Sequence, residues 1–202
     1  MSMRVPFAVL AAAGLLAAPH ASAQVKPFVG AGLGFNTVAN EITLEGPPDA
    51  KLPTGNSNFA FQIEGGVRVD AGNMVWGVGL YINPLTLNAG KFDSGGGVTL
   101  ETEYKNLIGV FGELGWKLGS ATVAYGRLSF NQAKAELSAF GESISKNFTG
   151  IGLGAGIRQT LADNSYLFVD WHHIMGSDTT VDLGLRIKPS ITTGLVGVGW
   201  MF

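Results

Sequence analysis

The segment Val196-Gly197-Val198-Gly199-Trp200-Met201-Phe202 alternates along its whole length, and it decides the fold. Successive side chains of a β-strand point to opposite faces, so positions 196, 198, 200 and 202 share one face, with Val, Val, Trp and Phe. Positions 197, 199 and 201 share the other. The first face is apolar and ends in aromatic residues, as in a strand that leaves a lipid bilayer. This pattern predicts a transmembrane β-strand.

The N-terminus has the composition of a secretory signal peptide. Arg4 precedes an apolar stretch from Val5 to Ala18, and small residues follow at 21–23. We expect cleavage after Ala23, which divides the chain into a signal peptide, residues 1–23, and one domain, residues 24–202. An uncleaved anchor is the weaker alternative, because the stretch is shorter than the roughly 20 residues that a spanning helix needs.

The composition fits a membrane protein without spanning helices. Mean hydropathy is positive, yet no apolar run after the signal approaches the length of a spanning helix. Strands in which every second residue faces lipid give a positive mean hydropathy without any long apolar run. The chain has no cysteine, which excludes disulfides and thiolate metal sites. Its formal net charge of −2 does not suggest nucleic-acid binding, and we expect no cofactor and no metal.

Eight segments alternate in this way and predict an all-β fold, an eight-stranded antiparallel up-and-down transmembrane β-barrel. All charged residues within the segments, Lys105 included, fall on the inward-facing set. A charge on the lipid face costs roughly 2–4 kcal/mol at the midplane, so a bilayer enforces this asymmetry. A soluble barrel or sandwich is the alternative from alternation alone. The segments are 29–36, 59–69, 74–83, 105–118, 122–131, 148–158, 166–172 and 196–202.

Loop lengths and aromatic positions favour the membrane alternative. Tight turns are predicted at 70–73, 119–120 and 162–164, and long loops at 37–57, 84–102, 132–145 and 174–190. Short periplasmic turns and long extracellular loops are typical of outer-membrane barrels, so both termini are expected on the periplasmic side. The outward aromatics form two girdles. Trp76, Trp116, Trp200 and Phe202 lie at the turn end, and Phe35, Phe59, Phe130 and Trp171 lie at the loop end.

These features resemble the small eight-stranded outer-membrane barrels of the OmpA/OmpX and opacity-protein type. The resemblance runs through the signal, the strand and loop rhythm and the terminal Trp200-Met201-Phe202. It implies location in the outer membrane of a Gram-negative bacterium, contact with outer-membrane lipid and lipopolysaccharide, and a monomer. It also implies that Phe202 is read by the barrel-assembly machinery.

The inward-facing polar residues predict a filled lumen, because an eight-stranded barrel has room only for side chains. We expect Glu113 opposite Arg127 and the two to satisfy each other. By the same reasoning we expect Phe168 opposite Gly156 and Asp170 opposite Gly154. The lumen charges are predicted to form a structural plug rather than a conduction path. The predicted lumen network is Glu64, Arg68, Glu113, Lys117, Arg127, Arg158, Asp170 and His172.

Two motifs suggest chemistry and are better explained otherwise. Glycines repeat with a period of two at 30–34 and 150–156, but no helical pattern follows them, as a dinucleotide motif requires. His172 and His173, with Ser177 and Asp178 nearby, suggest a lipid A-modifying hydrolase. Adjacent strand residues point to opposite faces, however, so the histidines cannot share one site and a histidine at the barrel rim is favoured.

The sequence therefore favours a non-enzymatic surface protein, whose barrel anchors long extracellular loops for envelope structure or for adhesion to a partner. A narrow, porin-like pore is the first alternative and a lipid A-modifying hydrolase the weaker one. The loops are neither aromatic-rich nor strongly charged, so the extracellular ligand stays unknown.

Overall fold

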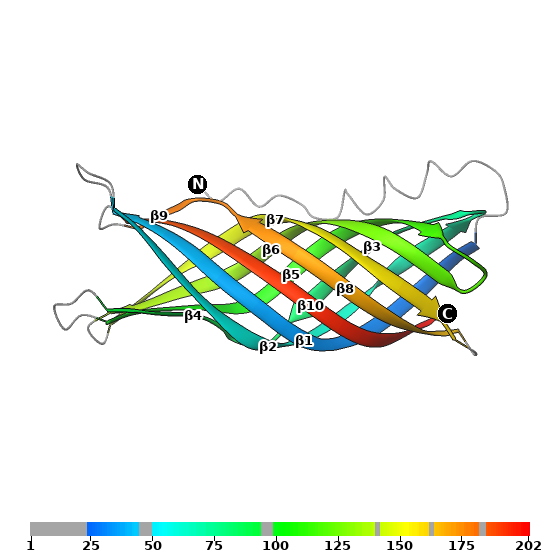
Figure 1. Cartoon of the computed structure of the whole chain (residues 1–202), viewed down its shortest axis with the longest axis horizontal. Coiled ribbons are helices and arrows are strands. Elements are labelled where there is room, and N and C mark those ends of the chain that lie inside the picture. Colours follow the sequence, from blue (N-terminus) through cyan, green and yellow to red (C-terminus); the bar gives the residue numbers. More distant parts are fainter. Residues whose placement is uncertain (1–23, 45–49, 94–98, 140–141, 162–163, 182–184) are drawn as a thin grey trace, which may run out of the picture.

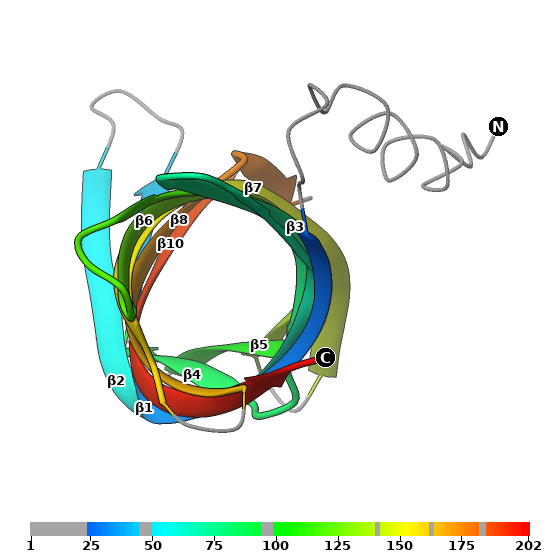
Figure 2. The ribbon, with the colours of Figure 1, turned by 90° about the vertical axis from the view of Figure 1, so that its right-hand side faces the viewer.

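The computed structural model describes residues 24–44, 50–93, 99–139, 142–161, 164–181 and 185–202 as a closed antiparallel β-barrel (Figure 1). The strands are β1 (Gln24–Leu44), β2 (Ala50–Ala71), β3 (Met74–Asn83), β4 (Leu87–Asp93), β5 (Thr99–Lys117), β6 (Thr122–Ala139), β7 (Glu142–Thr160), β8 (Ser165–Gly176), β9 (Thr179–Val181) and β10 (Leu185–Met201). The first and last strands pair from Phe28 opposite Met201 to Leu44 opposite Leu185, which closes the ring seen in Figure 2. The predicted all-β, eight-stranded barrel is confirmed.

The barrel wall has eight strand positions around the ring, which we call staves. The chain nevertheless forms ten strands, because two of the staves are interrupted. β3 ends before Pro84, which has no backbone N–H to donate, and β4 resumes the same stave by pairing with β5. Side chains then connect β4 to β2. Asn58 Nδ2 donates to the carbonyl oxygen of Asn88 at 2.8 Å, and the backbone N–H of Asn88 donates to Asn58 Oδ1 at 3.0 Å. In the same way β9 follows β8 and pairs with β10.

The strands are much longer than the alternation predicted, so the expectation of long loops at one end is wrong over most of their length. The ladder between β1 and β2 continues to Leu44 opposite Ala50, and that between β6 and β7 continues to Ala139 opposite Glu142. The outward residues become polar there, and the lipid-facing pattern stops while backbone pairing goes on. Residues 45–49, 94–98, 140–141 and 182–184, parts of the predicted loops, lie outside the described residues, as does the predicted signal peptide.

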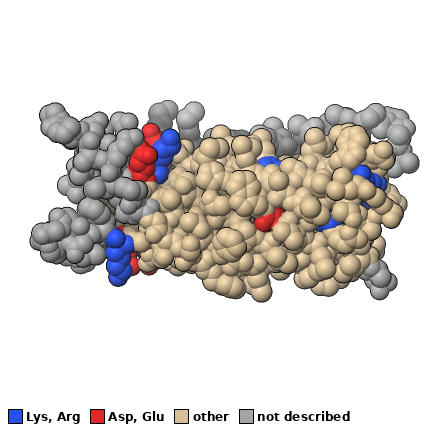
Figure 3. Space-filling model, in the orientation of Figure 1, with Lys and Arg blue, Asp and Glu red and all other residues tan. Residues whose placement is uncertain are grey.

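The interior divides into two layers along the barrel axis. Toward the loop end it is mostly apolar, with buried Val38, Tyr104, Phe148, Ile174 and Ile191 in one cluster, and buried Asn40 accepts a hydrogen bond from Tyr104 there. Midway along the barrel it is charged. The outer face differs, and in Figure 3 acidic and basic side chains lie together at the loop end, while the rest of the visible face is largely uncharged apart from scattered charged atoms in the middle and basic atoms toward the turn end. The buried charged side chains therefore lie at the level of the lipid-facing band. The buried apolar cluster lies in the part of the barrel that extends beyond this band.

Candidate functional site

A cluster of six charged side chains fills the middle of the lumen, and each is at most 5% exposed. They come from five strands because each occupies an inward position of its own strand. β2 contributes two of them and β5, β6, β7 and β8 one each. The cluster is Glu64, Arg68, Glu113, Arg127, Arg158 and Asp170.

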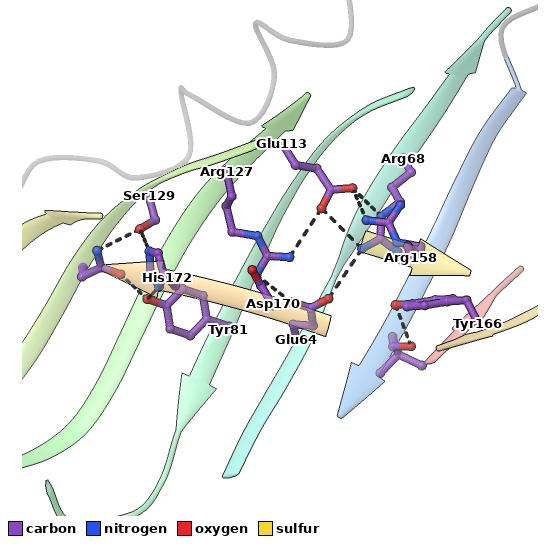
Figure 4. Close-up of polar contacts among 12 residues, drawn as sticks. Glu64, Arg68, Tyr81, Glu113, Arg127, Ser129, Arg158, Tyr166, Asp170 and His172 are labelled. Atoms are coloured by element: carbon purple, nitrogen blue, oxygen red, sulfur yellow. Dashed lines mark hydrogen bonds and ion pairs between the residues drawn. The ribbon is translucent and has the colours of Figure 1, made fainter. Parts of the chain in front are cut away.

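Glu113 is the centre of the half of the cluster nearer the turn end (Figure 4). Its Oε1 accepts hydrogen bonds from Arg68 Nε at 2.6 Å and from Arg158 Nη2 at 2.7 Å. The Arg127 guanidinium reaches its Oε2 at 3.4 Å. One carboxylate thus bridges three arginines, and three strands other than its own are tied together through it.

Arg127 is the matching centre on the cationic side. Its Nη1 lies 2.9 Å from Glu64 Oε2 and 2.8 Å from Asp170 Oδ2. Arg68 Nη2 completes the ring of contacts at 3.5 Å from Glu64 Oε1. The three arginines and three carboxylates have opposite and equal formal charges, so the cluster is neutral when all are ionised. Buried charges require such pairing, since their desolvation is costly.

Aromatic rings cover the arginines. The guanidinium carbon of Arg68 lies 3.4 Å from the ring centroid of Phe28, and that of Arg127 lies 4.0 Å from the centroid of Phe111. Contacts of this kind are favourable when the cation is desolvated. Glycines on the neighbouring strands make room for the rings, and a Cβ at Gly156 would overlap the ring of Tyr125. The result is a close-packed plug.

A second, uncharged network adjoins the plug on its loop-end side and was not predicted. Ser129 Oγ lies 2.8 Å from His172 Nε2, and Asn131 Nδ2 donates to Ser129 Oγ at 2.9 Å. Tyr81 donates its hydroxyl hydrogen to Asn131 Oδ1, and its oxygen lies 3.5 Å from His172 Nδ1. The alternation along each strand places these residues on the lumen wall. Only the register between the strands brings them together. All four are buried, so this serine–histidine pair has no exposure to a substrate.

The two histidines are separated, as strand geometry requires. His172 is buried in the lumen, where the predicted lumen network also has it, and it does not lie at the rim. His173 faces outward, stacks on Trp171 with ring centroids 6.3 Å apart, and places Nδ1 2.8 Å from Thr192 Oγ1. Ser177 instead donates its backbone N–H to the Thr149 carbonyl oxygen. The residues that suggested a hydrolase do not form one site.

Lys105 and Lys117 lie outside the buried cluster. Asn106 adopts a left-handed conformation, with φ of 53°, and the register with β6 shifts between Lys105 and Ile108. This bulge turns Lys105 to the outer face, where Nζ lies 2.5 Å from Glu136 Oε2, so the inward placement expected for Lys105 is wrong. Lys117 is partly exposed at the turn end and forms an ion pair with Asp70.

The register between β7 and β8 differs by two residues from the expected one. Asp170 lies opposite Gly156 rather than Gly154, and Phe168 lies opposite Arg158. Leu161 donates its N–H to the carbonyl oxygen of Ser165, so the connection has the bounds of the predicted turn, and the expected pairing, two residues off, did not follow from that turn. A shift of two keeps every side chain on its face, so both residues still point into the lumen.

The outward aromatics lie on the outer wall. Phe35 pairs with Phe59 across β1 and β2, and Trp116 pairs with Met74 across β5 and β3. Seven of the eight rank among the exposed large hydrophobic side chains, and Trp76 is half-buried. In the part of the chain that the structure describes, no helix is long and apolar enough to cross a membrane. Nor do the described residues contain three or more acidic or histidine side chains placed to hold a metal ion.

Comparisons with solved structures show the same fold. The outer membrane protein OprG from Pseudomonas aeruginosa has 16% sequence identity and a TM-score of 0.56, covering 88% of this chain and 96% of its own. The outer membrane protease OmpT from Escherichia coli has 9% identity and a TM-score of 0.54, covering 88% and 97%. Neisserial surface protein A has 12% identity and a TM-score of 0.50, covering 87% and 97%. No curated protein matches the chain significantly.

A protein-family model, that of the outer membrane protein β-barrel domain, matches residues 7–202. This match spans nearly the whole chain and agrees with the closed barrel of the described residues. Barrels of this family reside in the outer membrane of Gram-negative bacteria, and the apolar outer band of this chain fits a lipid bilayer. The protein therefore belongs to the outer membrane protein β-barrel family.

Proposed function

We propose that the protein is a non-enzymatic, non-conducting surface protein whose barrel anchors an extracellular β-structure for binding a partner. The observation that supports it is the plug. Six charged side chains and their aromatic neighbours occupy the lumen, and an apolar layer follows toward the loop end. A water-filled path for ions needs a polar, open lumen, and this arrangement favours an anchor over a pore.

The part that contacts a partner is the extension of the strands beyond the aromatic band. On its outer face, β4, β5 and β6 carry Lys91, Glu101, Glu103, Lys105, Lys134 and Glu136. These side chains pair with one another, as with Lys134 Nζ at 3.0 Å from Glu136 Oε1. These charged side chains offer hydrogen-bond donors and acceptors to a protein or carbohydrate. We call this surface the charged sheet.

The orientation belongs to the same proposal. The turn end and both chain ends face the periplasm, the charged sheet faces outward, and the barrel is a monomer in contact with lipopolysaccharide. Phe202, exposed on the outer wall at the end of β10, is the residue that the barrel-assembly machinery reads. Removal of residues 1–23 precedes assembly.

The orientation can be tested directly because the chain has no cysteine. A membrane-impermeant maleimide should label Lys134→Cys in intact cells, and it should label Ser120→Cys only after the outer membrane is permeabilised. Labelling of Ser120→Cys alone in intact cells would contradict the proposal and indicate the opposite orientation in the membrane.

Partner binding is tested on the charged sheet itself. Cells that display the wild-type barrel should adhere to a protein- or carbohydrate-coated surface more than cells without it. The variant with Glu103→Gln, Lys105→Gln, Lys134→Gln and Glu136→Gln should lose this gain while its barrel stays heat-modifiable. Lys26→Gln, at the opposite end, is the control. Equal adhesion of the wild-type strain, the strain without the barrel and the quadruple variant would overturn the binding role.

A further inference from the structure

The turn end of the barrel contains a cavity of about 170 Å³ that the plug and the charged sheet do not use. One water needs roughly 10–15 Å³ on this measure, so the cavity holds several waters or one small ion with part of its hydration. Four of its lining side chains are cationic, namely Lys26, Arg68, Lys117 and Arg158, and one, Asp70, is a carboxylate. Ser120, Thr160 and Asn164 add uncharged polar groups.

The floor of the cavity consists of the two arginines at the edge of the plug. Figure 4 shows Arg68 and Arg158 beyond Glu113, on the side opposite Ser129 and His172. Both side chains are 3% exposed and both donate to Glu113. Arg68 Nη1 and Arg158 Nε have no hydrogen-bond partner among the described residues. A guanidinium has five N–H donors, and a buried donor without an acceptor is costly, so each arginine has hydrogen-bonding capacity that the plug does not use. The two atoms themselves are fully buried, so an anion in the cavity meets the other guanidinium N–H groups or shifts the side chains.

The charge balance at this end favours an anion. The six-residue plug is neutral, which leaves Lys26, Lys117 and Asp70 to set the sign at the cavity wall. Lys117 is paired with Asp70. No carboxylate of the described residues forms an ion pair with Lys26, whose inward position on β1 is two residues before Phe28. The wall therefore carries one positive charge in excess, above two guanidinium groups that have donors to spare. Walls of one sign and low dielectric concentrate ions of the opposite sign.

We propose that this cavity binds a small oxyanion of the phosphate class. The guanidinium groups supply donors at the floor, as arginine does for phosphate, and Lys26 supplies charge at the mouth. Asp70 opposes binding, because its carboxylate repels the anion and occupies Lys117. A free phosphate ion and the phosphate of a lipid headgroup share this chemistry.

Inorganic phosphate in non-ionic detergent is the probe, measured by equilibrium dialysis against the folded, heat-modifiable barrel in chloride buffer of constant ionic strength. Wild type should bind one equivalent saturably. Lys26→Gln should weaken binding roughly tenfold, and Asp70→Asn should strengthen it, because the two changes alter the wall charge in opposite directions. Lys91→Gln, on the charged sheet, should change nothing. These rim substitutions leave the plug intact.

Binding that does not saturate, or that is equal in wild type, Lys26→Gln and Asp70→Asn, would overturn the proposal. The source of the phosphate follows from comparing dialysis in the non-ionic detergent, which contains no phosphate, with dialysis in nanodiscs of phosphatidylcholine or phosphatidylglycerol. Loss of inorganic phosphate binding in either nanodisc assigns the site to a lipid headgroup, and equal binding in detergent and nanodiscs assigns it to the free ion.

Discussion

Glu113 and Arg127 occupy paired positions of β5 and β6, yet each forms its shortest ion pair with a residue of another strand. Glu113 Oε1 is 2.6 Å from Arg68 Nε, and Arg127 Nη1 is 2.8 Å from Asp170 Oδ2, while the two paired residues are separated by 3.4 Å. These two contacts each pass over one intervening strand, β3 or β7, instead of following the ladder. The plug therefore connects strands that are not hydrogen-bonded neighbours.

The first prediction concerns coupling within this cluster. Glu113→Gln, Arg127→Gln and Arg158→Gln should each lower the free energy of unfolding by about 3–5 kcal/mol, because each leaves buried charges without a partner. In double-mutant cycles, the coupling of Glu113 with Arg158 should exceed its coupling with Arg127, within the usual range of about 0.5–3 kcal/mol. Denaturant unfolding in detergent measures these quantities. Additive losses for Glu113 and Arg158 would contradict the geometry.

The second prediction concerns the glycines beneath the lumen rings. A Cβ at Gly156 would overlap the ring of Tyr125, whereas a Cβ at Gly112 would meet nothing within 4 Å. Gly156→Ala should destabilise the barrel by about 1–3 kcal/mol through overpacking, and Gly112→Ala should not destabilise it. Urea midpoints of the two variants, compared in the same detergent, provide the measurement. Equal midpoints would mean that the ring is free to move.

The third prediction concerns Glu136, on the charged sheet beyond the aromatic band. Hydrogen bonds from Lys105 and then Lys134 stabilise the charged carboxylate, so its pKa lies below the ordinary value of 4.5. Lys105→Gln should raise this pKa toward the ordinary value, and Lys134→Gln should raise it less. A ¹³C NMR titration of the Glu136 carboxyl measures both. An unchanged titration in Lys105→Gln would place Lys105 back in the lumen.

The fourth prediction concerns the terminal strand. Phe202 is 74% exposed on the outer wall, and Met201 is half-buried on the inner one. Deleting Phe202 should lower the amount of heat-modifiable barrel recovered from outer membranes more than Met201→Ala does. Gel migration with and without boiling quantifies the folded fraction. Comparable recovery of the two variants would remove the special role of the terminal aromatic.

Much of the fold was predictable because lipid and a narrow lumen constrain alternate residues directly. The alternation around Val196 gave the strand phase, and the same reasoning placed Glu113 opposite Arg127. The full strand lengths were not predictable, because the outward residues become polar beyond the aromatic band while backbone pairing continues. Lys105 was misplaced for a related reason, since a bulge at Asn106 changes the phase and leaves no hydrophobic signal.

The sequence predicted which residues belong to the candidate site better than it predicted which of them contact one another. The alternation of inward and outward positions along each strand identified all six residues of the plug. Alternation gives no distances between side chains inside the lumen. The link from Arg127 to Glu64 and Asp170 depends on the shape of the closed barrel. The network of Ser129, Asn131 and Tyr81 around His172 depends on how three strands, β3, β6 and β8, are placed relative to one another. Neither can be derived from one strand at a time.

Planar-bilayer conductance of the purified, heat-modifiable wild-type barrel tests the central claim most directly, namely that the lumen is plugged and the barrel serves as an anchor. We expect no steady conductance, because the neutral cluster around Glu113 and Arg127 and the apolar layer beyond it occupy the lumen. A stable, reproducible open channel in the wild-type protein would contradict this account and favour a pore.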